Sequence, residues 1–276
     1  MLLRILSDLH FRDATSKLRH LEDLEPLLHG VSELWLNGDT CDNQSGMPPA
    51  ELDQIRRFFT SRVPTVRFIT GNHDPDISTI HEAHTSQGRL WAVHGDVFLD
   101  DIVPWSRGRH NITQRLANIR RLHPMLDYDT LPDRFQIQRT ACLGFRRECN
   151  PEQRNLTHRA KRFAIEVFPP RQPWAMLHTW LTFSRRAIRL AQRWRPDAQI
   201  IVTGHVHFPR VWHHHDKTVI NTGAFSSPFG AYCVDVVDDA VTVHRLRNRQ
   251  GKWHPGRVVA SIPLAPKPLA GLTTAL

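Results

Sequence analysis

Five short stretches of the sequence place Asp, Asn or His directly after an apolar run. They are SDLH (residues 7–10), NGD (37–39), GNHD (71–74), HGD (94–96) and GHVH (204–207). Carboxylate, amide and imidazole groups without a thiolate favour Zn²⁺, Mn²⁺ or iron over a sulfur-loving ion. In Asp8-x-His10 and His205-x-His207, an extended backbone would send the alternate side chains to the same side. The sequence therefore predicts a metal site built from several of these stretches.

The number of these side chains indicates more than one metal ion. Together they hold at least seven Asp, Asn and His side chains with suitable ligand atoms. Seven ligands are too many for one tetrahedral ion, but they suit two ions that share a bridging carboxylate. Two ions about 3.5–4 Å apart stabilise both the attacking and the leaving oxygen of an in-line phosphoryl displacement. This set of residues therefore favours phosphoester hydrolysis.

The apolar runs before these stretches are typical of buried strands. Such runs occur at residues 2–6, 33–39, 65–72, 89–96 and 200–203. Leucines at helical spacing predict a helix over residues 17–30 that stops near Gly30, and a second helix is expected over 50–59. Alternating strands and helices indicate an α/β sheet covered by helices, in which the loops that end the strands meet. Gly38, Gly71 and Gly204 are expected to allow sharp turns and close backbone approach there.

The chain turns to β structure after the GHVH stretch. Residues 218–223, 231–237 and 240–246 are expected to be consecutive strands of a second sheet. Asn221 and Gly223 follow one of these strands and are expected to support the floor of the site. The histidines at 213–215 fall in a strand or hairpin and are interpreted as ordinary surface residues. The tail, residues 261–276, is rich in proline, lacks periodicity and is expected to be loosely ordered.

The middle of the chain, residues 97–196, differs in character. It holds 19 Lys and Arg against 8 Asp and Glu, and this excess of 11 positive charges is larger than the net charge of +9 of the whole chain. Residues 176–194 carry an apolar stripe at helical spacing: Leu177, Trp180, Leu181, Ile188, Ala191 and Trp194. We favour a helix that packs this stripe on the sheet or on a neighbouring helix. The alternative is a basic amphipathic surface that contacts anionic lipid.

The five stretches, in this order, resemble the signature blocks of the calcineurin-like metallophosphoesterases. The resemblance covers residues 1–96 and about 197–235. It implies an α/β fold, a four-layer αββα sandwich of two mixed β-sheets flanked by helices. Residues 1–96 and 197–260 would form this core, and residues 97–196 a basic, mainly helical insert that comprises a cap and a core-packing helix.

The same resemblance assigns roles to residues. One ion would be held by Asp8, His10 and His207, the other by Asn72, His94 and His205, and Asp39 would bridge them. His73 would stabilise or protonate the leaving group, with Asp74 orienting it. A hydroxide shared by the two metals would attack phosphorus. The metals would be two ions of Mn, Fe or Zn, and Asp42 and Asp96 are expected to fix ligand orientation through hydrogen bonds.

The substrate is left open among several classes. The position of the insert is similar to that in the enzymes that cleave the pyrophosphate of UDP-2,3-diacylglucosamine, in which the insert forms a cap for acyl chains. Those enzymes commonly carry arginine where this chain has His73, so the prediction stays with a phosphomonoester, phosphodiester or pyrophosphate, with a UDP-acylglucosamine-type compound as one candidate. A nuclease or nucleotide phosphodiesterase is the second hypothesis. A metal-containing scaffold without turnover is the third.

The totals exclude other classes of protein. No stretch of the 276 residues is apolar enough to cross a bilayer, and Asp8 interrupts what would be the apolar core of a signal peptide. Cys41, Cys142, Cys149 and Cys233 lack metal-site or disulfide spacing, which suits a reducing compartment. We therefore expect a cytoplasmic protein, peripheral at the membrane if the lipid interpretation holds, whose main partner is a small phosphorylated molecule.

Overall fold

The predicted apolar runs form strands of two mixed sheets. The computed structural model describes residues 1–106, 108–145, 171–226 and 228–264. Within them the strands are β1 (Leu2–Leu6), β2 (Glu33–Asn37), β3 (Thr65–Ile69), β4 (Glu82–Thr85), β5 (Leu90–Val93), β6 (Ile200–Thr203), β7 (Arg210–His214), β8 (Lys217–Asn221), β9 (Tyr232–Val237), β10 (Ala240–Arg249) and β11 (Lys252–Pro263). The α-helices are α1 (Glu25–Leu28), α2 (Pro49–Thr60), α3 (Arg109–Leu122), α4 (Leu131–Cys142) and α6 (Arg171–Trp194). Short 3₁₀ turns are η1 (Leu21–Leu24), η2 (Asn43–Ser45), η3 (Ser86–Gly88) and η4 (Asp96–Phe98).

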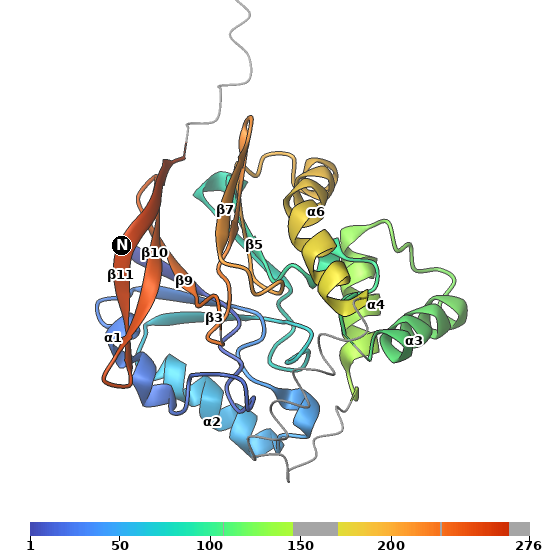
Figure 1. Ribbon diagram of the computed structural model, residues 1–276, viewed down its shortest axis with the longest axis horizontal. Helices are drawn as coiled ribbons and strands as arrows, with labels where there is room; N and C mark the ends of the chain where they lie inside the picture. Colours follow the sequence, from blue (N-terminus) through green and yellow to red (C-terminus); the bar gives the residue numbers. More distant parts are fainter. Residues whose placement is uncertain (107, 146–170, 227, 265–276) are drawn as a thin grey trace, which may run out of the picture.

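The first sheet has the strand order β11-β10-β9-β1-β2-β3, and the second has the order β4-β5-β6-β8-β7. In the first sheet β1, β2 and β3 are parallel, while β9 pairs antiparallel with β1 and β10. In the second, β5, β6 and β8 are parallel. Parallel strands end at one edge of a sheet, so the loops that carry the predicted ligands lie together (Figure 1).

Apolar side chains divide the molecule into four layers. One cluster packs leucines of α1 and aromatic residues of α2, such as Phe59, on the first sheet. A second cluster fills the space between the sheets and includes Ile5 and Trp35 from one side and Leu90 and Ile220 from the other. A third covers the outer face of the second sheet with α6. The predicted αββα sandwich is therefore confirmed, with α1 and α2 as one outer layer and α6 as the other (Figure 1).

Helix α6 packs on the sheet, as the favoured interpretation predicts, but its buried face differs in part from the predicted stripe, because Leu177 and Leu181 are exposed. Phe183, Ala187 and Ala191 are fully buried against the second sheet. The three residues recur at intervals of four, so they lie on one face of the helix. Arg185 and Arg189 are exposed on the other face. The last part of the expected insert is thus an integral layer of the sandwich.

The rest of the described insert is helical and has a core of its own. Helices α3 and α4 enclose Ile112, Leu116 and Ile137, together with Ile102 from the segment before α3. They lie to one side of α6 (Figure 1). Residues 146–170, which also belong to the expected insert and include Cys149, lie outside the described residues.

Three expectations about elements were wrong in detail. Strands β9 and β10 were expected in the second sheet with β8, but they extend the first sheet through pairing of β9 with β1. The expected tail begins too early, because β11 continues to Pro263 in pairing with β10 and Leu264 is buried. Residues 265–276 of that tail lie outside the described residues. Helical structure in the 17–30 segment starts only at Leu21, although Leu18 is buried as the spacing suggests.

The described part of the chain bears on two expectations, one about membrane-spanning segments and one about the cysteines. None of its helices combines the length and the apolar character needed to span a bilayer. Cys41, Cys142 and Cys233 are buried free thiols. Burial raises the pKa of each of these thiols, to about 12 for Cys233, which suits a structural role.

Candidate metal centre

The predicted ligands lie at the carboxyl ends of five parallel strands. Asp8 and His10 follow β1, Asp39 follows β2, Asn72 follows β3, His94 follows β5, and His205 and His207 follow β6. β1, β2 and β3 belong to one sheet and β5 and β6 to the other. The site is therefore built between the two sheets, from segments as far apart in sequence as residues 8 and 207.

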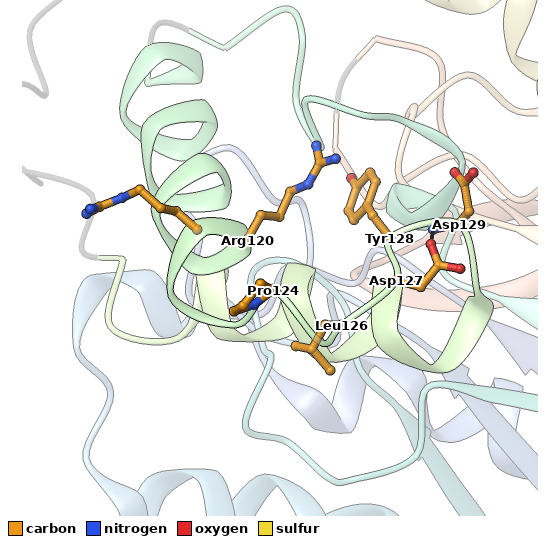
Figure 2. A pocket seen from close by; sticks show the side chains of 7 residues that line it. Arg120, Pro124, Leu126, Asp127, Tyr128 and Asp129 are labelled. Atoms are coloured by element: carbon orange, nitrogen blue, oxygen red, sulfur yellow. Dashed lines mark hydrogen bonds between the residues drawn. The ribbon is translucent and has the colours of Figure 1, made fainter.

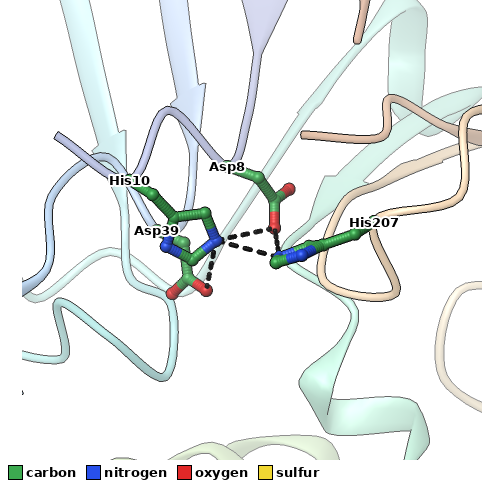
Figure 3. A group of neighbouring side chains, drawn as sticks. All are labelled: Asp8, His10, Asp39 and His207. Carbon is green, nitrogen blue, oxygen red and sulfur yellow. Dashed lines mark hydrogen bonds and ion pairs between the residues drawn. The ribbon is translucent and has the colours of Figure 1, made fainter. Parts of the chain in front are cut away.

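One group of ligand atoms brings together Asp8, His10, Asp39 and His207. One ligand atom from each lies within 4.8 Å of the others (Figure 3). His10 Nε2 lies 2.9 Å from His207 Nε2 and 3.7 Å from Asp39 Oδ2. His207 Nε2 lies 3.1 Å from Asp8 Oδ1. Two imidazole nitrogens and two carboxylate oxygens thus point at one small volume, which is the donor set of a divalent cation.

A second group shares Asp39 with the first. Ligand atoms of Asp39, His94 and His205 lie within 4.8 Å of one another. His94 Nε2 lies 3.3 Å from Asp39 Oδ2 and 3.3 Å from Asn72 Oδ1, which brings the amide of Asn72 to the same place. Asp39 is therefore positioned to bridge two ions, as the resemblance implies. All seven predicted ligands converge on one centre.

Backbone carbonyls fix which nitrogen of two histidines faces this centre. His94 Nδ1 lies 3.0 Å from the carbonyl oxygen of Asn37, and His205 Nε2 lies 2.8 Å from that of Ile102. A carbonyl only accepts, so these nitrogens carry the hydrogen and donate it. The opposite nitrogens, Nε2 of His94 and Nδ1 of His205, therefore face the centre and would offer lone pairs to a bound metal. Without the metal, burial of His94 is outweighed by Asp39, which raises the pKa of this imidazole well above its ordinary value.

The electrostatics of the centre suit cations. Burial lowers the pKa of His10 to about 4, and burial together with His94 lowers that of His205 to about 3, so both rings are neutral ligands at neutral pH. Burial opposes the charge on Asp39, yet His94 and the other histidines hold the pKa of this carboxyl well below its ordinary value. Buried, ionised carboxylates need positive charge beside them. The residues present therefore fit a pair of metal ions.

The backbone at the ligands is strained. Five of the seven ligands are non-glycine residues in the left-handed region, with φ of 50° at Asp8, 46° at His10, 51° at Asp39, 71° at His205 and 53° at His207. Such conformations cost about 1–3 kcal/mol each and persist only where the surrounding structure imposes them. The sequence motifs gave no sign of this feature. It shows that the fold stabilises the arrangement of ligands at a cost.

Glycines allow the loops to approach one another closely, as the sequence predicts. A Cβ on Gly204 would lie 1.9 Å from Asp8 Oδ2, and one on Gly71 would lie 2.2 Å from Asp39 Oδ1. A Cβ on Gly38, whose φ is +84°, would lie 2.4 Å from the ring of His94. Each of these glycines thus leaves room for a ligand side chain from another strand.

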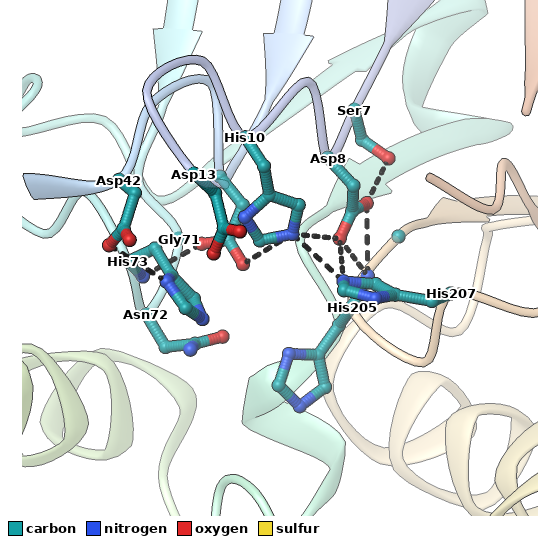
Figure 4. A network of polar contacts seen from close by, with 12 residues as sticks. Ser7, Asp8, His10, Asp13, Asp42, Gly71, Asn72, His73, His205 and His207 are labelled. Carbon is teal, nitrogen blue, oxygen red and sulfur yellow. Dashed lines mark hydrogen bonds and ion pairs between the residues drawn. The ribbon is translucent and has the colours of Figure 1, made fainter. Parts of the chain in front are cut away.

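His73 lies beside the metal ligands but is oriented by a different carboxylate from the one expected. Its ring packs edge-on against that of His10, with centroids 4.8 Å apart, and its Nδ1 lies 3.2 Å from Asp42 Oδ1 (Figure 4). Asp74 instead accepts hydrogen bonds from the backbone N–H groups of Asp39, Thr40 and Gly71. The orienting role therefore falls to Asp42, and Asp74 holds the loop that carries Asp39. Asp42 was expected to orient a ligand and acts instead on the non-ligand histidine.

Asp74, which is buried, and Asp96, which is half-buried, are carboxyls with raised pKa values. Burial and the nearby charge of Asp39 raise the pKa of Asp74 to about 7. Burial also raises the pKa of Asp96, whose Oδ1 accepts the N–H of Val97. That contact fixes the turn after His94, which is the kind of indirect support expected of Asp96.

Further residues support the predicted ligands through hydrogen bonds, and only some of them could be found from the sequence. The hydroxyl of Ser7 donates to Asp8 Oδ2 and contacts the hydroxyl of Thr222. The amide of Asn221 donates to the carbonyl of Gly204, which agrees with its expected place in the floor of the site. Ser7 precedes a ligand and could have been suspected from that position. Thr222 and the carbonyl of Ile102 could not, because only the folded chain brings them to the site.

A separate hollow of about 500 Å³ lies in the insert. It is lined by residues at the end of α3 and in the connection to α4: Arg120, Arg121, Pro124, Leu126, Asp127, Tyr128 and Asp129 (Figure 2). Arg120 stacks over the ring of Tyr128 at 4.7 Å. None of these residues belongs to the groups that converge on Asp39. The hollow is therefore distinct from the metal centre.

Comparison with known proteins gives one family and a set of distant structural neighbours. Residues 1–238 match the model of the calcineurin-like phosphoesterase superfamily domain. A solved structure of a predicted phosphoesterase from Streptococcus pneumoniae is 15% identical, with 95% of this chain and 97% of that chain covered and a TM-score of 0.41. Vps29 from Entamoeba histolytica complexed with zinc is 10% identical, with 96% and 100% covered and a TM-score of 0.44.

A dimetal phosphatase from Danio rerio is 12% identical, with 96% of this chain and 99% of that chain covered and a TM-score of 0.44. Comparison with curated proteins gives no match.

Proposed function

Because the chain belongs to the calcineurin-like phosphoesterase superfamily, we propose that it is a hydrolase of phosphate esters or anhydrides that works with two metal ions. The observation that carries the proposal is the position of Asp39, whose carboxylate belongs to both groups of ligand atoms. Asp8, His10 and His207 would hold one ion, and Asn72, His94 and His205 the other. A shared carboxylate sets two cations close together, which is the arrangement that phosphoryl transfer uses.

The bound metals would supply Lewis acidity and a water molecule that is acidic enough to act as nucleophile near neutral pH. The side chains of the chain itself do the rest. Asp39 and Asp8 balance the positive charge, and the hydrogen bond from His94 Nδ1 to Asn37 directs its Nε2 into the site. Asp42 holds Nδ1 of His73, so proton donation to a leaving-group oxygen falls to Nε2 of that ring.

Hydrolysis of bis-p-nitrophenyl phosphate tests this proposal. We expect activity that depends on added Mn²⁺, is lost in Asp39→Asn and falls by about 10²- to 10⁴-fold in kcat in His73→Ala. Mn²⁺ binding, measured by calorimetry, should be weakened in Asp39→Asn and retained in His73→Ala, because His73 is not a ligand. Metal binding without turnover of any phosphoester would instead support the alternative of a non-catalytic scaffold.

For the substrate we propose a small anionic phosphate compound, with a UDP-acylglucosamine-type molecule as one candidate. Several arginines of the insert are engaged within the protein. Arg115 donates to the carbonyl of Ala141, Arg134 to that of Val97 and Arg139 to that of Pro75. Such arginines are committed to structure, which weakens the case for a basic surface that follows a nucleic acid backbone. Hydrolysis of UDP-sugars with and without acyl chains, compared with single-stranded DNA, distinguishes these classes.

We also propose that the exposed face of α6 contacts an anionic membrane from the cytoplasmic side. Trp174, Leu177 and Leu181 are 66%, 42% and 68% exposed, and the exposed Arg185 and Arg189 continue the same face toward the end of the helix. Apolar and basic residues on one face suit an anionic lipid surface. Sedimentation with vesicles of phosphatidylglycerol, but not of phosphatidylcholine, should carry the protein down, and Leu181→Glu should abolish it. The buried free cysteines support the cytoplasmic location.

A further inference from the structure

The insert contacts the GHVH loop on both sides. On one side the carbonyl of Ile102, in the segment before α3, accepts the hydrogen of His205 Nε2 at 2.8 Å. On the other side the indole nitrogen of Trp180, in α6, donates to the carbonyl of Val206 at 2.9 Å. Val206 stands between the two ligands His205 and His207. The loop that would supply one ligand to each metal is therefore held on both sides by residues outside the five motif stretches.

The Ile102 contact is held firmly in place. Ile102 has φ of 57° and is 1% exposed, and a β-branched residue adopts this conformation only when its surroundings impose it. Helix α4 supplies those surroundings, because Gln138 donates to the carbonyl of Leu99 at 3.0 Å and Arg134 to that of Val97 at 2.7 Å. The insert thus fixes the carbonyl that selects the tautomer of His205.

The Trp180 contact is equally well supported. The indole stacks on Phe208, with centroids 4.9 Å apart and planes 19° apart, and Phe229 packs edge-on against both rings. Phe208 directly follows the ligand His207. The next residue of α6 on the buried face is Phe183, which is fixed in the core. A tryptophan anchored on a rigid helix therefore holds both the peptide between the two ligands and the ring after them.

We propose that Trp180 is a positioning residue of the metal centre, acting through the peptide of Val206 on His205 and His207. The inference rests on the proposed function, since it concerns the affinity of the same site for its metals. His205 and His207 both have left-handed backbone, at φ of 71° and 53°, so the loop needs an external contact to keep this form. The indole N–H supplies one. Loss of it would let the loop relax and spread the two imidazoles.

The test compares two tryptophans of the same helix. Trp180→Phe removes the N–H donor and keeps an aromatic ring on Phe208. The matched control is Trp194→Phe, because the indole of Trp194 also donates to a backbone carbonyl, that of Asp129, at 3.0 Å. Asp129 lies in the insert, away from the ligands. Mn²⁺ dissociation constants are measured by calorimetry on chelator-treated protein, together with thermal unfolding without metal and kcat and KM with bis-p-nitrophenyl phosphate.

We expect Trp180→Phe to weaken Mn²⁺ binding by about tenfold, the lower end of what loss of a supporting contact costs a metal site. Trp194→Phe should bind Mn²⁺ as the parent protein does, even if both variants unfold at similarly lowered temperatures. Unchanged affinity in Trp180→Phe, or equal weakening in both variants, would overturn the proposal. A parent protein that binds no Mn²⁺ would overturn the proposed function instead.

A second measurement covers the case in which Trp180→Phe does not fold. In the parent protein labelled with ¹⁵N-tryptophan, the indole resonance of Trp180 is recognised by its nuclear Overhauser contacts to Phe208 and Phe229. Saturation with Zn²⁺ should shift this resonance and leave that of Trp194 in place. A Trp180 resonance that does not respond to Zn²⁺ would contradict the positioning role.

Discussion

At the scale of single residues, the metal centre depends on a glycine without a side chain as much as on the predicted ligands. Gly204 has no Cβ, and the carboxylate of Asp8 occupies the space where one would be. The same carboxylate accepts the N–H of His205 at 3.0 Å. A ligand from β1 and the backbone after β6 therefore interlock at this one position.

Replacement of Gly204 should disrupt the site more than the fold. In Gly204→Ala the new Cβ would lie 1.9 Å from Asp8 Oδ2, so the carboxylate has to move away from His207. We expect at least about tenfold weaker Mn²⁺ binding, measured by calorimetry. Gly108→Ala is the control, since its Cβ would lie 3.2 Å from the ring of Phe145 and 3.6 Å from Ser106 Oγ, and would touch none of the predicted ligands. Equal Mn²⁺ affinity in the two variants would show that this close approach is unimportant.

At the scale of elements, helix α6 joins the insert to the sandwich. Its buried face covers the second sheet through Phe183, Ala187 and Ala191, and Trp180 on the same helix reaches the GHVH loop. A helix that ends the insert in sequence is thus a structural layer of the core. Changes on the buried face should lower the stability of the protein. Changes on the exposed face should leave stability unchanged and affect membrane binding instead.

The variant Phe183→Ala should destabilise the protein by about 3–5 kcal/mol, because it removes a fully buried aromatic side chain and leaves a cavity. Leu181→Ala, two residues away and 68% exposed, should change the free energy of unfolding by less than about 0.5 kcal/mol. Urea unfolding followed by circular dichroism measures both. A small effect of Phe183→Ala would mean that α6 does not pack on the sheet as described.

The elements also show how far the sequence alone leads. Strands followed by Asp, Asn or His are visible in the sequence, because burial imposes apolar runs and metal ligation limits the residue types that follow. The resemblance of these stretches to the family's signature blocks therefore allowed seven ligands to be predicted, and the seven side chains lie together in the fold. The sheet of β9 and β10 could not, since apolar alternation indicates a strand but not its partner. The roles of Asp42 and Asp74 could not be assigned from the sequence either. Both lie near His73 in sequence or space, and only the folded chain shows which carboxylate contacts its ring.

At the scale of the whole molecule, the centre links stability to pH. Burial lowers the pKa of His10 to about 4 from an ordinary value near 6.5, so the unfolded chain binds a proton in this range that the folded chain does not. The stabilisation from neutral His10 is thus complete above pH 6.5 and lost as the pH falls toward 4. Asp74, with a pKa raised to about 7, acts in the opposite direction.

A comparison of variants separates these contributions. Between pH 6.5 and 4, metal-free parent protein should lose more stability than His10→Gln, by up to about 3 kcal/mol, because only the parent has this imidazole to protonate. Asp74 is common to both and cancels. Urea unfolding at a series of pH values measures the difference. Parallel curves for the two proteins would show that His10 titrates in the folded state as it does in the unfolded chain.

The pairing of β1 with β9 has a consequence for how the protein is made. β1 lies in the interior of the first sheet, but the partner on one of its sides, Tyr232–Val237, is more than 220 residues further along the chain. During synthesis β1 must therefore wait, with one edge unpaired, until β9 has left the ribosome. A chain truncated before residue 232 should aggregate rather than yield a partial enzyme.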